Sequence, residues 1–284
     1  MVIIRIFGGL GNQMFQYALY HSMLSKGIDA YVDLSWYDDQ NCHNGYELSN
    51  IFSVSPRIAS LSDVKRLGEN DKNILWRAWH KLVRRKGTFF CKYGKEAIRY
   101  YPEVFNLDEK YLSGYWQSEL FFKEEEDEIR KIFSFSPLNE EENIKLADIM
   151  QSTESVSLHV RRGDYLNESL LNGICDEKYY EKAIKKIQEK ASDPVFFIFS
   201  NDIAWCREHF QQDNVVFVEN NIKGNSYRDM QLMSLCKHHI IANSSFSWWG
   251  AWLGKYKDSM ICAPTKWMNA KVSSDVVCAD WIKI

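Results

Sequence analysis

The chain has 284 residues, of which 45% are hydrophobic and 26% are charged, and its formal net charge is −3. This length suits two domains of ordinary size or one large domain, and the weak negative charge argues against a general nucleic-acid binder. The seven cysteines include no CxxC pair, which argues against a disulfide framework and favours a cytoplasmic location.

The N-terminal residues have the pattern of a βαβ unit. Residues 2–7 predict a buried strand, residues 12–26 a helix that Asn12 caps, and residues 30–34 a second strand. Because the chain starts with a strand, we expect no signal peptide. No apolar run reaches the roughly 20 residues that a membrane span requires.

A glycine turn connects the first predicted strand to the helix. Gly9 and Gly11 leave backbone N–H groups at the helix N-terminus, where Gln13 lies beside them and an anion can bind. The turn also has the first two glycines of a dinucleotide-binding fingerprint, with Asp33 about 20 residues further on. Met14 stands in place of the third glycine, and an NAD-type oxidoreductase is an alternative that the turn leaves open.

The middle of the chain is expected to be mostly helical. Residues 71–86 predict a basic helix with tryptophans, which packs on its own domain or makes peripheral contact with an anionic membrane surface. Residues 119–133 predict a helix with an acidic, solvated face, and a polar helix ends at about Gln151. We place the domain boundary there, which gives domains of residues 1–150 and 151–284.

From residue 155 onward, predicted strands and helices alternate, as is typical of a parallel sheet covered on both faces. Strands are expected at residues 155–160, 195–200, 215–218, 239–242 and 259–263, and helices at about residues 176–190, 202–210, 226–237 and 246–254. The sequence therefore predicts an α/β protein of two halves, whose strand-end loops face a shared cleft.

The most informative segment is the run His159-Val160-Arg161-Arg162-Gly163-Asp164-Tyr165, which follows a predicted strand. Ligands of α/β proteins bind where strands open into loops, and the planar guanidinium of arginine suits the paired oxygens of a phosphate. Alternation along an extended segment places His159 and Arg161 on one face, toward a ligand. It leaves Arg162 and Asp164 to form a structural ion pair. The motif therefore predicts a site for an anionic, phosphorylated ligand.

A second loop follows the strand predicted at residues 239–242. Asn243, Ser244, Ser245 and Phe246 form a turn in which hydroxyl and N–H groups can cap the next helix and hold a phosphate at its positive end. Asp202 follows another strand, where its carboxylate can accept two hydrogen bonds from a guanine or bind a ribose. Both features place further polar groups at strand ends.

The sequence contains no metal-binding motif. An Asp-x-Asp pair is missing, and residues 236–239, which include one cysteine and two histidines, are expected to pack in the core. We therefore expect neither a metal nor a cofactor.

Together, three of these segments resemble the bacterial α-1,2-fucosyltransferases of glycosyltransferase family 11. The resemblance rests on residues 8–17 (GGLGNQMFQY), 159–165 (HVRRGDY) and 243–250 (NSSFSWWG), and it spans nearly the whole chain in the right order. It implies a GT-B-like fold of two Rossmann-like domains, with residues 1–150 on the acceptor side and residues 151–284 binding GDP-L-fucose. Residues 36–112 match least well, and we expect acceptor selection there.

The resemblance also implies an activity. This is inverting, metal-independent transfer of L-fucose to the 2-hydroxyl of a galactose, in an oligosaccharide or in a lipid-linked glycan at the inner membrane. Arg161 would then offset the charge that grows on the departing phosphate, with help from backbone N–H groups at residues 11–12 and 244–246.

The resemblance further implies roles for single residues. Related fucosyltransferases place the arginine of such a motif on the donor pyrophosphate and a strand-end aspartate on guanine, which implies these roles for Arg161 and Asp202. A related class has a glutamate a few residues after the arginine motif, so Glu168 is a candidate base beside Asp164. Other relatives have an asparagine where Asn12 stands, and we expect Asn12 to position a substrate.

Two other functions stay open at this point. The NAD-type oxidoreductase rests on the glycine turn and Asp33 alone. A non-catalytic glycan-binding protein rests on the 10 tryptophans and 15 tyrosines, whose flat rings suit sugar faces.

Overall fold

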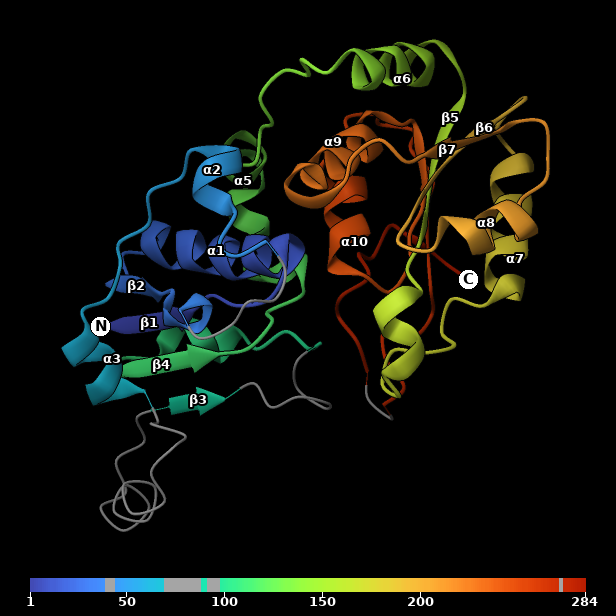
Figure 1. The fold of residues 1–284 in the computed structure, drawn as a ribbon. Helices are drawn as coiled ribbons and strands as arrows, with labels where there is room; N and C mark the ends of the chain where they lie inside the picture. The colour runs from blue at the N-terminus through green and yellow to red at the C-terminus, as the bar shows by residue number, and fades with distance from the viewer. Residues whose placement is uncertain (39–43, 69–87, 91–97, 271–272) are drawn as a thin grey trace. The chain divides into compact units, whose positions relative to one another are not determined.

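The computed structural model describes residues 1–38, 44–68, 88–90, 98–270 and 273–284 (Figure 1). These residues form two compact units, Met1–Ile132 and Phe133–Ile284. The helix predicted at residues 71–86, with the membrane contact suggested for it, lies outside the described residues. Within them, no helix has both the length and the apolar character needed to cross a membrane.

Unit 1 contains a parallel sheet whose strands lie in the order β2-β1-β4-β3. The strands are β1 (Val2–Arg5), β2 (Ala30–Asp33), β3 (Thr88–Phe90) and β4 (Lys110–Ser113). The α-helices are α1 (Leu10–Ser25), α2 (Leu48–Phe52), α3 (Leu61–Leu67) and α5 (Glu126–Ile132). Short 3-10 helices are η1 (Ser35–Tyr37), η2 (Pro102–Asn106), η3 (Glu119–Phe121) and η4 (Lys123–Glu125).

Two predictions for unit 1 are wrong in detail. Gly9 is the N-cap of α1, so Asn12 lies inside the first turn and does not cap the helix. Gly8 makes this earlier start sterically easy, because its φ of +81° suits a residue without a Cβ. The single helix predicted at residues 119–133 is interrupted, because Phe122 has a φ of −143°, outside the helical range.

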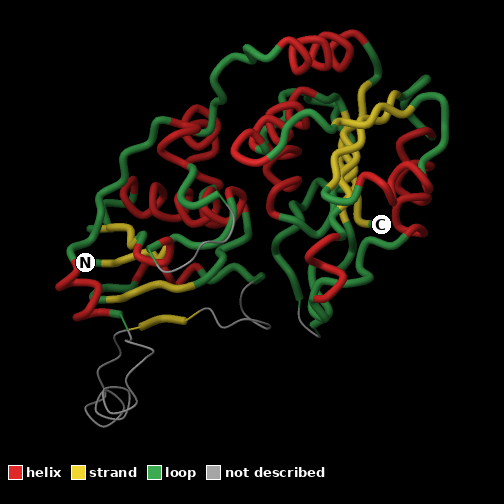
Figure 2. The backbone as a smooth tube through the Cα atoms, viewed as in Figure 1, coloured by secondary structure: helices red, strands yellow, loops and turns green. Residues whose placement is uncertain are grey.

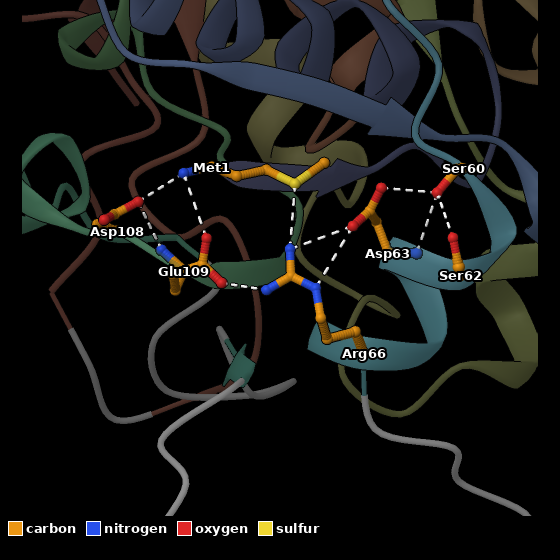
Figure 3. Close-up of polar contacts among 7 residues, drawn as sticks. All are labelled: Met1, Ser60, Ser62, Asp63, Arg66, Asp108 and Glu109. Atoms are coloured by element: carbon orange, nitrogen blue, oxygen red, sulfur yellow. Dashed lines mark hydrogen bonds and ion pairs between the residues drawn. The ribbon is translucent and has the colours of Figure 1, made fainter.

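A polar network on the surface joins α3 to the start of β4, at the amino end of this sheet (Figure 3). Arg66 donates to Asp63 on its own helix at 3.1 Å and also pairs with Glu109, which precedes β4. Ser60 caps α3 by accepting a hydrogen bond from the Asp63 backbone N–H at 3.1 Å. Exposed ion pairs of this kind each stabilise a protein by about 1 kcal/mol or less.

Unit 2 contains a fully parallel sheet in the order β10-β9-β8-β5-β6-β7. The strands are β5 (Ser155–Val160), β6 (Val195–Ser200), β7 (Val215–Val218), β8 (His238–Ile240), β9 (Ile261–Ala263) and β10 (Ile282–Lys283). The helices are α6 (Glu141–Ser152), α7 (Glu177–Gln188), α8 (Ile203–His209), α9 (Tyr227–Leu235) and α10 (Ser245–Trp252), with the 3-10 helices η5 (Gly163–Asn167) and η6 (Lys223–Asn225).

This architecture confirms the predicted α/β class, with two Rossmann-like domains built on parallel sheets. Figures 1 and 2 show α7 and α8 on one face of the unit 2 sheet and α6, α9 and α10 on the other. Every residue of β5 is buried, because helices cover both of its faces. Val156, Leu158 and Val160 pack toward α7 and α8, so alternation directs Ser157 and His159 toward α9 and α10.

The boundary between the units follows Ile132, whereas the sequence places it at residue 150. Helix α6 explains the difference, because it packs against β5 and α9 of unit 2. Its Asn143 side chain accepts hydrogen bonds from the side chains of Asn220 and Asn221 at 2.6 and 3.0 Å. Helix α6 is therefore part of the second unit.

Candidate functional site

The strand order of unit 2 determines where a ligand can bind. The chain adds β5, β6 and β7 in one direction, then crosses to β8 on the other side of β5 and continues outward to β9 and β10. The connecting helices on the two sides of this crossing lie on opposite faces. In α/β sheets of this topology, ligands bind in a crevice at the carboxyl ends of the strands beside the crossing, which here are β5 and β8. Leu158 lies opposite Ile240, so the residues that follow these strands leave the sheet side by side.

The segments 159–165 and 243–246 meet at this crevice. The Tyr165 hydroxyl donates to the Asn243 carbonyl at 3.3 Å. The rings of His159 and Phe246 lie 6.0 Å apart, centroid to centroid. Two motifs that are some 80 residues apart in sequence thus form one cluster, which we call the switch-point site.

Arg161 is the cation of this site. Its Nη2 donates to Asp164 Oδ2 at 2.9 Å, and its guanidinium lies 5.5 Å from the centroid of the Tyr165 ring. Its Nε is buried and makes no hydrogen bond among the described residues. About 30% of the side chain is exposed, so Arg161 keeps donors available for an anion.

Arg162 points away from the switch-point site. Its Nε donates to Asp202 Oδ2 at 3.2 Å, and its guanidinium lies 4.3 Å from the centroid of the Trp205 ring. The predicted ion pair between Arg162 and Asp164 is therefore wrong. The strand ends at Val160, and η5 brings Asp164 back under Arg161, three residues earlier, while Arg162 turns toward α8.

Asp202 is engaged within the protein at both oxygens. Oδ2 accepts from Arg162, and Oδ1 caps α8 by accepting from the Trp205 backbone N–H at 3.3 Å. Asp202 lies at the carboxyl edge of the sheet, as expected from its position after β6. Its predicted role on guanine would require it to exchange or share these bonds.

Asn201 was not predicted as a functional residue, yet it holds the arginine loop in place. Its Oδ1 accepts from the Arg162 backbone N–H at 3.0 Å, and its Nδ2 donates to Asp164 Oδ1 at 3.2 Å. A Cβ at Gly163 would lie 2.4 Å from Asn201 Nδ2, so glycine is needed for this close approach. The glycine at position 163 thus allows the close packing of the arginine loop against Asn201.

The N-terminus of α10 forms the other side of the site. Ser244 is its N-cap, and the Ser244 Oγ accepts from the Phe246 backbone N–H at 3.3 Å. Ser245 is the first helical residue, and first-turn N–H groups lack intrahelical partners. Asn243 is 3% exposed and donates to the carbonyls of Leu171 and Trp267, both at 3.3 Å, so it fixes the loop.

His159 is a neutral, buried member of the site. It is 5% exposed, and burial together with the neighbouring Arg161 guanidinium lowers the pKa of His159 to about 3. Its Nδ1 makes no hydrogen bond in the described part of the chain. The positive charge at this end of β5 therefore comes from Arg161 and not from the imidazole.

The two candidate bases near the arginine motif lie in different surroundings. Asp164 accepts from the Arg161 guanidinium at 2.9 Å and from Asn201 Nδ2 at 3.2 Å. Glu168 follows η5 and is exposed, and its carboxylate makes no hydrogen bond to any described residue. Both residues lie near the switch-point site and stay candidates.

The carboxyl group of Asp229 was not predicted from the sequence as a functional group. It lies in the first turn of α9, which starts at the carboxyl edge because it follows β7. Burial raises the pKa of Asp229 to about 7, although Asn221 Nδ2 donates to its Oδ1 at 2.8 Å. The helix predicted at residues 226–237 already placed Asp229 in a first turn, and this position was the signal available in the sequence.

The glycine turn of unit 1 supplies the remaining predicted residues. Gln13 is fully buried, and its Nε2 donates to the carbonyls of Gly8 and Gly45 at 3.0 and 2.8 Å. Its Oε1 accepts from the Glu47 backbone N–H at 2.9 Å, so Gln13 ties the turn to the next loop. Asn12 is half-buried, and its Oδ1 accepts from Gln117 Nε2 at 2.8 Å.

Gly9 and Gly11 lie at the start of α1, where helix N–H groups are concentrated. Asp33, by contrast, is 4% exposed, and its oxygens accept from the Tyr111 hydroxyl at 2.5 Å and the Ser35 backbone N–H at 2.9 Å. The carboxylate on which the oxidoreductase alternative depends is thus engaged inside unit 1.

The described residues contain no group of three or more His, Cys, Asp or Glu side chains arranged to hold a metal. His238 Nε2 pairs with Glu154 at 2.9 Å, and His239 Nδ1 hydrogen-bonds with Ser157 at 2.8 Å. Both histidines are buried, as the sequence analysis expects for residues 236–239.

Comparisons with known proteins agree with these motifs. The model of the family described as Glycosyl transferase family 11 matches residues 69–284. An α-1,2-colitosyltransferase of Escherichia coli is 35% identical, with 100% of this chain and 99% of the relative aligned. A galactoside α-(1,2)-fucosyltransferase 2 of Rattus norvegicus is 30% identical, covering 89% of this chain and 67% of the relative.

Among solved structures, the NodZ α-1,6-fucosyltransferase soaked with GDP-fucose is 15% identical, with a TM-score of 0.47. The alignment covers 89% of this chain and 92% of that structure. POFUT1 in complex with GDP is 13% identical, with a TM-score of 0.46 over 92% of this chain and 97% of that one.

The neutral state of His159 predicts a pH-dependent contribution to stability. The imidazole titrates near 6.5 in the unfolded chain and near 3 in the folded one, so between these values the unfolded chain binds one more proton. Folded stability therefore falls as pH falls below about 6.5. Between pH 7.5 and 5.5, the wild type should lose about 1.4 kcal/mol more unfolding free energy than His159→Gln.

Urea denaturation of both proteins at the two pH values measures this difference. Burial also lowers the pKa of His239 to about 3, but His239 is present in both proteins and its contribution cancels. Equal losses in the two proteins would show that His159 titrates normally in the folded state.

Proposed function

The chain belongs to glycosyl transferase family 11, and from this premise we propose that it transfers L-fucose from GDP-L-fucose to the 2-hydroxyl of a galactose in a glycan acceptor. The chain is a glycosyltransferase related to α-1,2-fucosyl- and α-1,2-colitosyltransferases over most of its length. The relatives' names support an α-1,2 linkage, and the galactoside relatives support a galactose acceptor.

The observation that carries this proposal is that the loop of Arg161 and the N-terminus of α10 contact each other at the switch point of unit 2, through Tyr165 and Asn243 and through His159 and Phe246. A nucleoside diphosphate leaving group needs positive charge and N–H donors, and this crevice offers both. The proposal assigns the diphosphate to Arg161 and to the backbone N–H groups of Ser245 and Phe246. Asn243 and Ser244 hold that loop in position.

The proposed reaction breaks the bond between the anomeric carbon of fucose and the β-phosphate oxygen, and forms a bond to the acceptor oxygen. The electron pair of the broken bond goes to GDP, where negative charge grows on the β-phosphate. Arg161 and the α10 N-terminus stabilise that charge, so the proposed reaction needs no metal. The acceptor oxygen displaces GDP in one step, which inverts the configuration of the anomeric carbon. The acceptor proton passes to Asp164, to Glu168 or to the departing phosphate.

The α-1,2-colitosyltransferase relative supports a second donor. Colitose is L-fucose without its 3-hydroxyl group, so the two donors differ at one position. A site that hydrogen-bonds the 3-hydroxyl rejects the deoxy donor by about 10⁴-fold, whereas a site that ignores it accepts both.

We also propose a cytoplasmic location. Among the described residues, Cys175, Cys206, Cys236 and Cys262 are free thiols, which a reducing compartment maintains. Cell fractionation with a cytoplasmic marker enzyme tests this location, and recovery with an oxidising extracellular fraction would contradict it.

An assay with GDP-L-fucose and lactose tests the main proposal. We expect an α-linked fucose on the galactose 2-hydroxyl, identified by NMR of the product, and activity that persists when EDTA is added. GDP-colitose in the same assay measures the donor preference. Failure of both donors with a panel of β-galactosides, in protein that GDP stabilises against heat, would contradict the proposed reaction.

Replacing Arg161 tests the role of the switch-point site. Arg161→Ala should lower turnover about 10²–10³-fold, because it removes charge stabilisation of the leaving group. The fold should persist, since the exposed Arg161–Asp164 pair stabilises the protein by about 1 kcal/mol or less. Arg207→Ala is the matched control, because Arg207 is an exposed arginine that pairs with Glu219 on the same unit. Near-normal turnover of Arg161→Ala would contradict the proposed role of Arg161 in stabilising the leaving group.

Asp202, which follows β6, and Asp229, in the first turn of α9, lead to different predictions for guanine recognition. Asp202 is engaged with Arg162 and α8, whereas Asp229 has one hydrogen-bond donor among the described residues, so we propose Asp229 as the guanine acceptor. Guanine N–H groups bind the ionised carboxylate, and the pKa of Asp229 is about 7 in the free protein. GDP affinity should therefore fall by about tenfold between pH 8 and pH 6.

Calorimetry with GDP and ADP at both pH values measures this effect. Asp229→Asn should weaken GDP binding and remove its pH dependence, while ADP binding should change little. Asp202→Asn retains a helix cap and is the matched control. If the pH dependence of GDP affinity persisted in Asp229→Asn and disappeared in Asp202→Asn, Asp202 and not Asp229 would be the residue that binds guanine.

A further inference from the structure

Two asparagine side chains connect helix α6 to the carboxyl group of Asp229. Asn143 lies on α6, and Asn221 lies in the loop after β7. Asn143 Nδ2 donates to Asn221 Oδ1 at 2.9 Å, and Asn221 Nδ2 donates back to Asn143 Oδ1 at 3.0 Å. Asn221 Nδ2 also donates to Asp229 Oδ1 at 2.8 Å. We call Asn143 and Asn221 the amide bridge.

The reciprocal pairing fixes the orientation of the Asn221 amide. Its oxygen and both of its N–H groups have partners in this arrangement. A reversed amide would turn the Asn221 oxygen toward the Asp229 carboxylate, where two acceptors would face each other. Asn143 is fully buried, so the other half of the pair has little freedom to move. Asn221 therefore presents an N–H group to the carboxylate.

Asp229 receives this amide and no cation. Arg228, its neighbour on α9, is directed to Glu140, whose Oε1 accepts from Arg228 Nε at 3.1 Å. Glu140 Oε2 accepts from Asn143 Nδ2 at 3.4 Å, so Arg228 and Glu140 flank the amide bridge as a pair of opposite charges. No described residue forms an ion pair with Asp229. An amide orients a carboxylate without neutralising it, whereas an arginine partner would compete with a ligand for its oxygens.

Asp229 keeps acceptor capacity for a ligand. It is half-buried, and no described residue donates a hydrogen bond to its Oδ2. Burial raises the pKa of Asp229 to about 7, and the Asn221 N–H opposes this rise because it favours the ionised carboxylate. Loss of the bond from Asn221 would therefore raise the pKa of Asp229 further. The bond holds the carboxylate in place and favours its charged form at neutral pH.

We propose that Asn143 and Asn221 are positioning residues for base recognition, because they hold the Asp229 carboxylate in the orientation that accepts the N–H groups of a guanine. Asn221 acts on Asp229 directly, and Asn143 acts through Asn221. This inference rests on the proposed function, which assigns guanine to Asp229, and it extends the donor site to α6. Guanine presents adjacent donors at N1 and N2, so it gains most from a carboxylate held in one plane.

The neighbouring Asn220 separates positioning from packing. Asn220 Nδ2 also donates to Asn143 Oδ1, at 2.6 Å. Asn220 and Asn221 are both half-buried, and both follow β7. Although Asn220 and Asp229 are both among the described residues, no hydrogen bond joins them. Asn220 thus matches Asn221 in chemistry, in burial and in its bond to α6, and differs in lacking the contact with Asp229.

The test measures GDP and ADP affinity by calorimetry from about pH 5.5 to about pH 9, in the wild type and in Asn221→Ala, Asn143→Ala and the double variant. The pH midpoint of GDP affinity should rise by about one unit in each variant, because the carboxylate loses the donor that favours its ionised form. GDP affinity at pH 7 should fall about fivefold or more, while ADP affinity should change little. The double variant should match Asn221→Ala, because Asn143 acts through Asn221.

Asn220→Ala is the matched control. It should keep the wild-type midpoint, even where loss of its bond to Asn143 lowers the melting temperature. Carbon-13 NMR of the Asp229 carboxyl group in the protein without GDP measures the same titration independently of binding. It should show the upward shift in Asn221→Ala and not in Asn220→Ala.

A wild-type midpoint in Asn221→Ala would overturn this inference, and so would an equal upward shift in Asn220→Ala, which would attribute the effect to packing of the loop. Additive losses of GDP affinity in Asn143→Ala and Asn221→Ala would overturn the role of Asn143. GDP affinity that does not depend on pH in the wild type would instead contradict the guanine role proposed for Asp229, and this inference with it. The wild-type profile therefore distinguishes failure of the proposed guanine site from failure of the amide bridge.

Discussion

The divergence of the chain at β5 and β8 decides where an anion can bind in unit 2. Parallel strands end at one edge of the sheet, and the crossing from β7 to β8 places the next helices on the opposite face. The loops after β5 and β8 therefore leave the sheet side by side at this switch point, where the Tyr165 hydroxyl donates to the Asn243 carbonyl. Arg161 comes from one loop and the N-terminus of α10 from the other, so both sources of positive potential depend on this topology.

The remaining polar groups of the site keep Arg161 available. Asp202 forms an ion pair with Arg162, and the Asn201 side chain hydrogen-bonds to both the Arg162 backbone N–H and Asp164. Burial holds His159 neutral, so it adds no second charge beside Arg161. These contacts fix the loop in one arrangement while Arg161 retains unpaired donors. A preorganised cation of this kind stabilises charge on a leaving group without rearranging first.

Much of this arrangement could be predicted from the sequence. The strands at residues 155–160, 195–200 and 215–218 were predicted with their observed bounds, the last two from continuous apolar runs and the first from alternating apolar residues. The two-residue strand β10 could not be predicted from the sequence, because it is recognisable only by its pairing with β9. Asp164 was predicted to pair with Arg162 but pairs with Arg161, because alternation along a strand no longer applies after β5 ends at Val160.

The central claim is that the diphosphate of the donor binds between Arg161 and the first turn of α10. A crystal structure of the protein with GDP tests it most directly, because it places the phosphates without reference to activity. We expect phosphate oxygens within hydrogen-bond distance of the Arg161 guanidinium and of the backbone N–H groups of Ser245 and Phe246. Phosphates bound at the glycine turn of unit 1 alone, with Arg161 still paired only to Asp164, would contradict the claim.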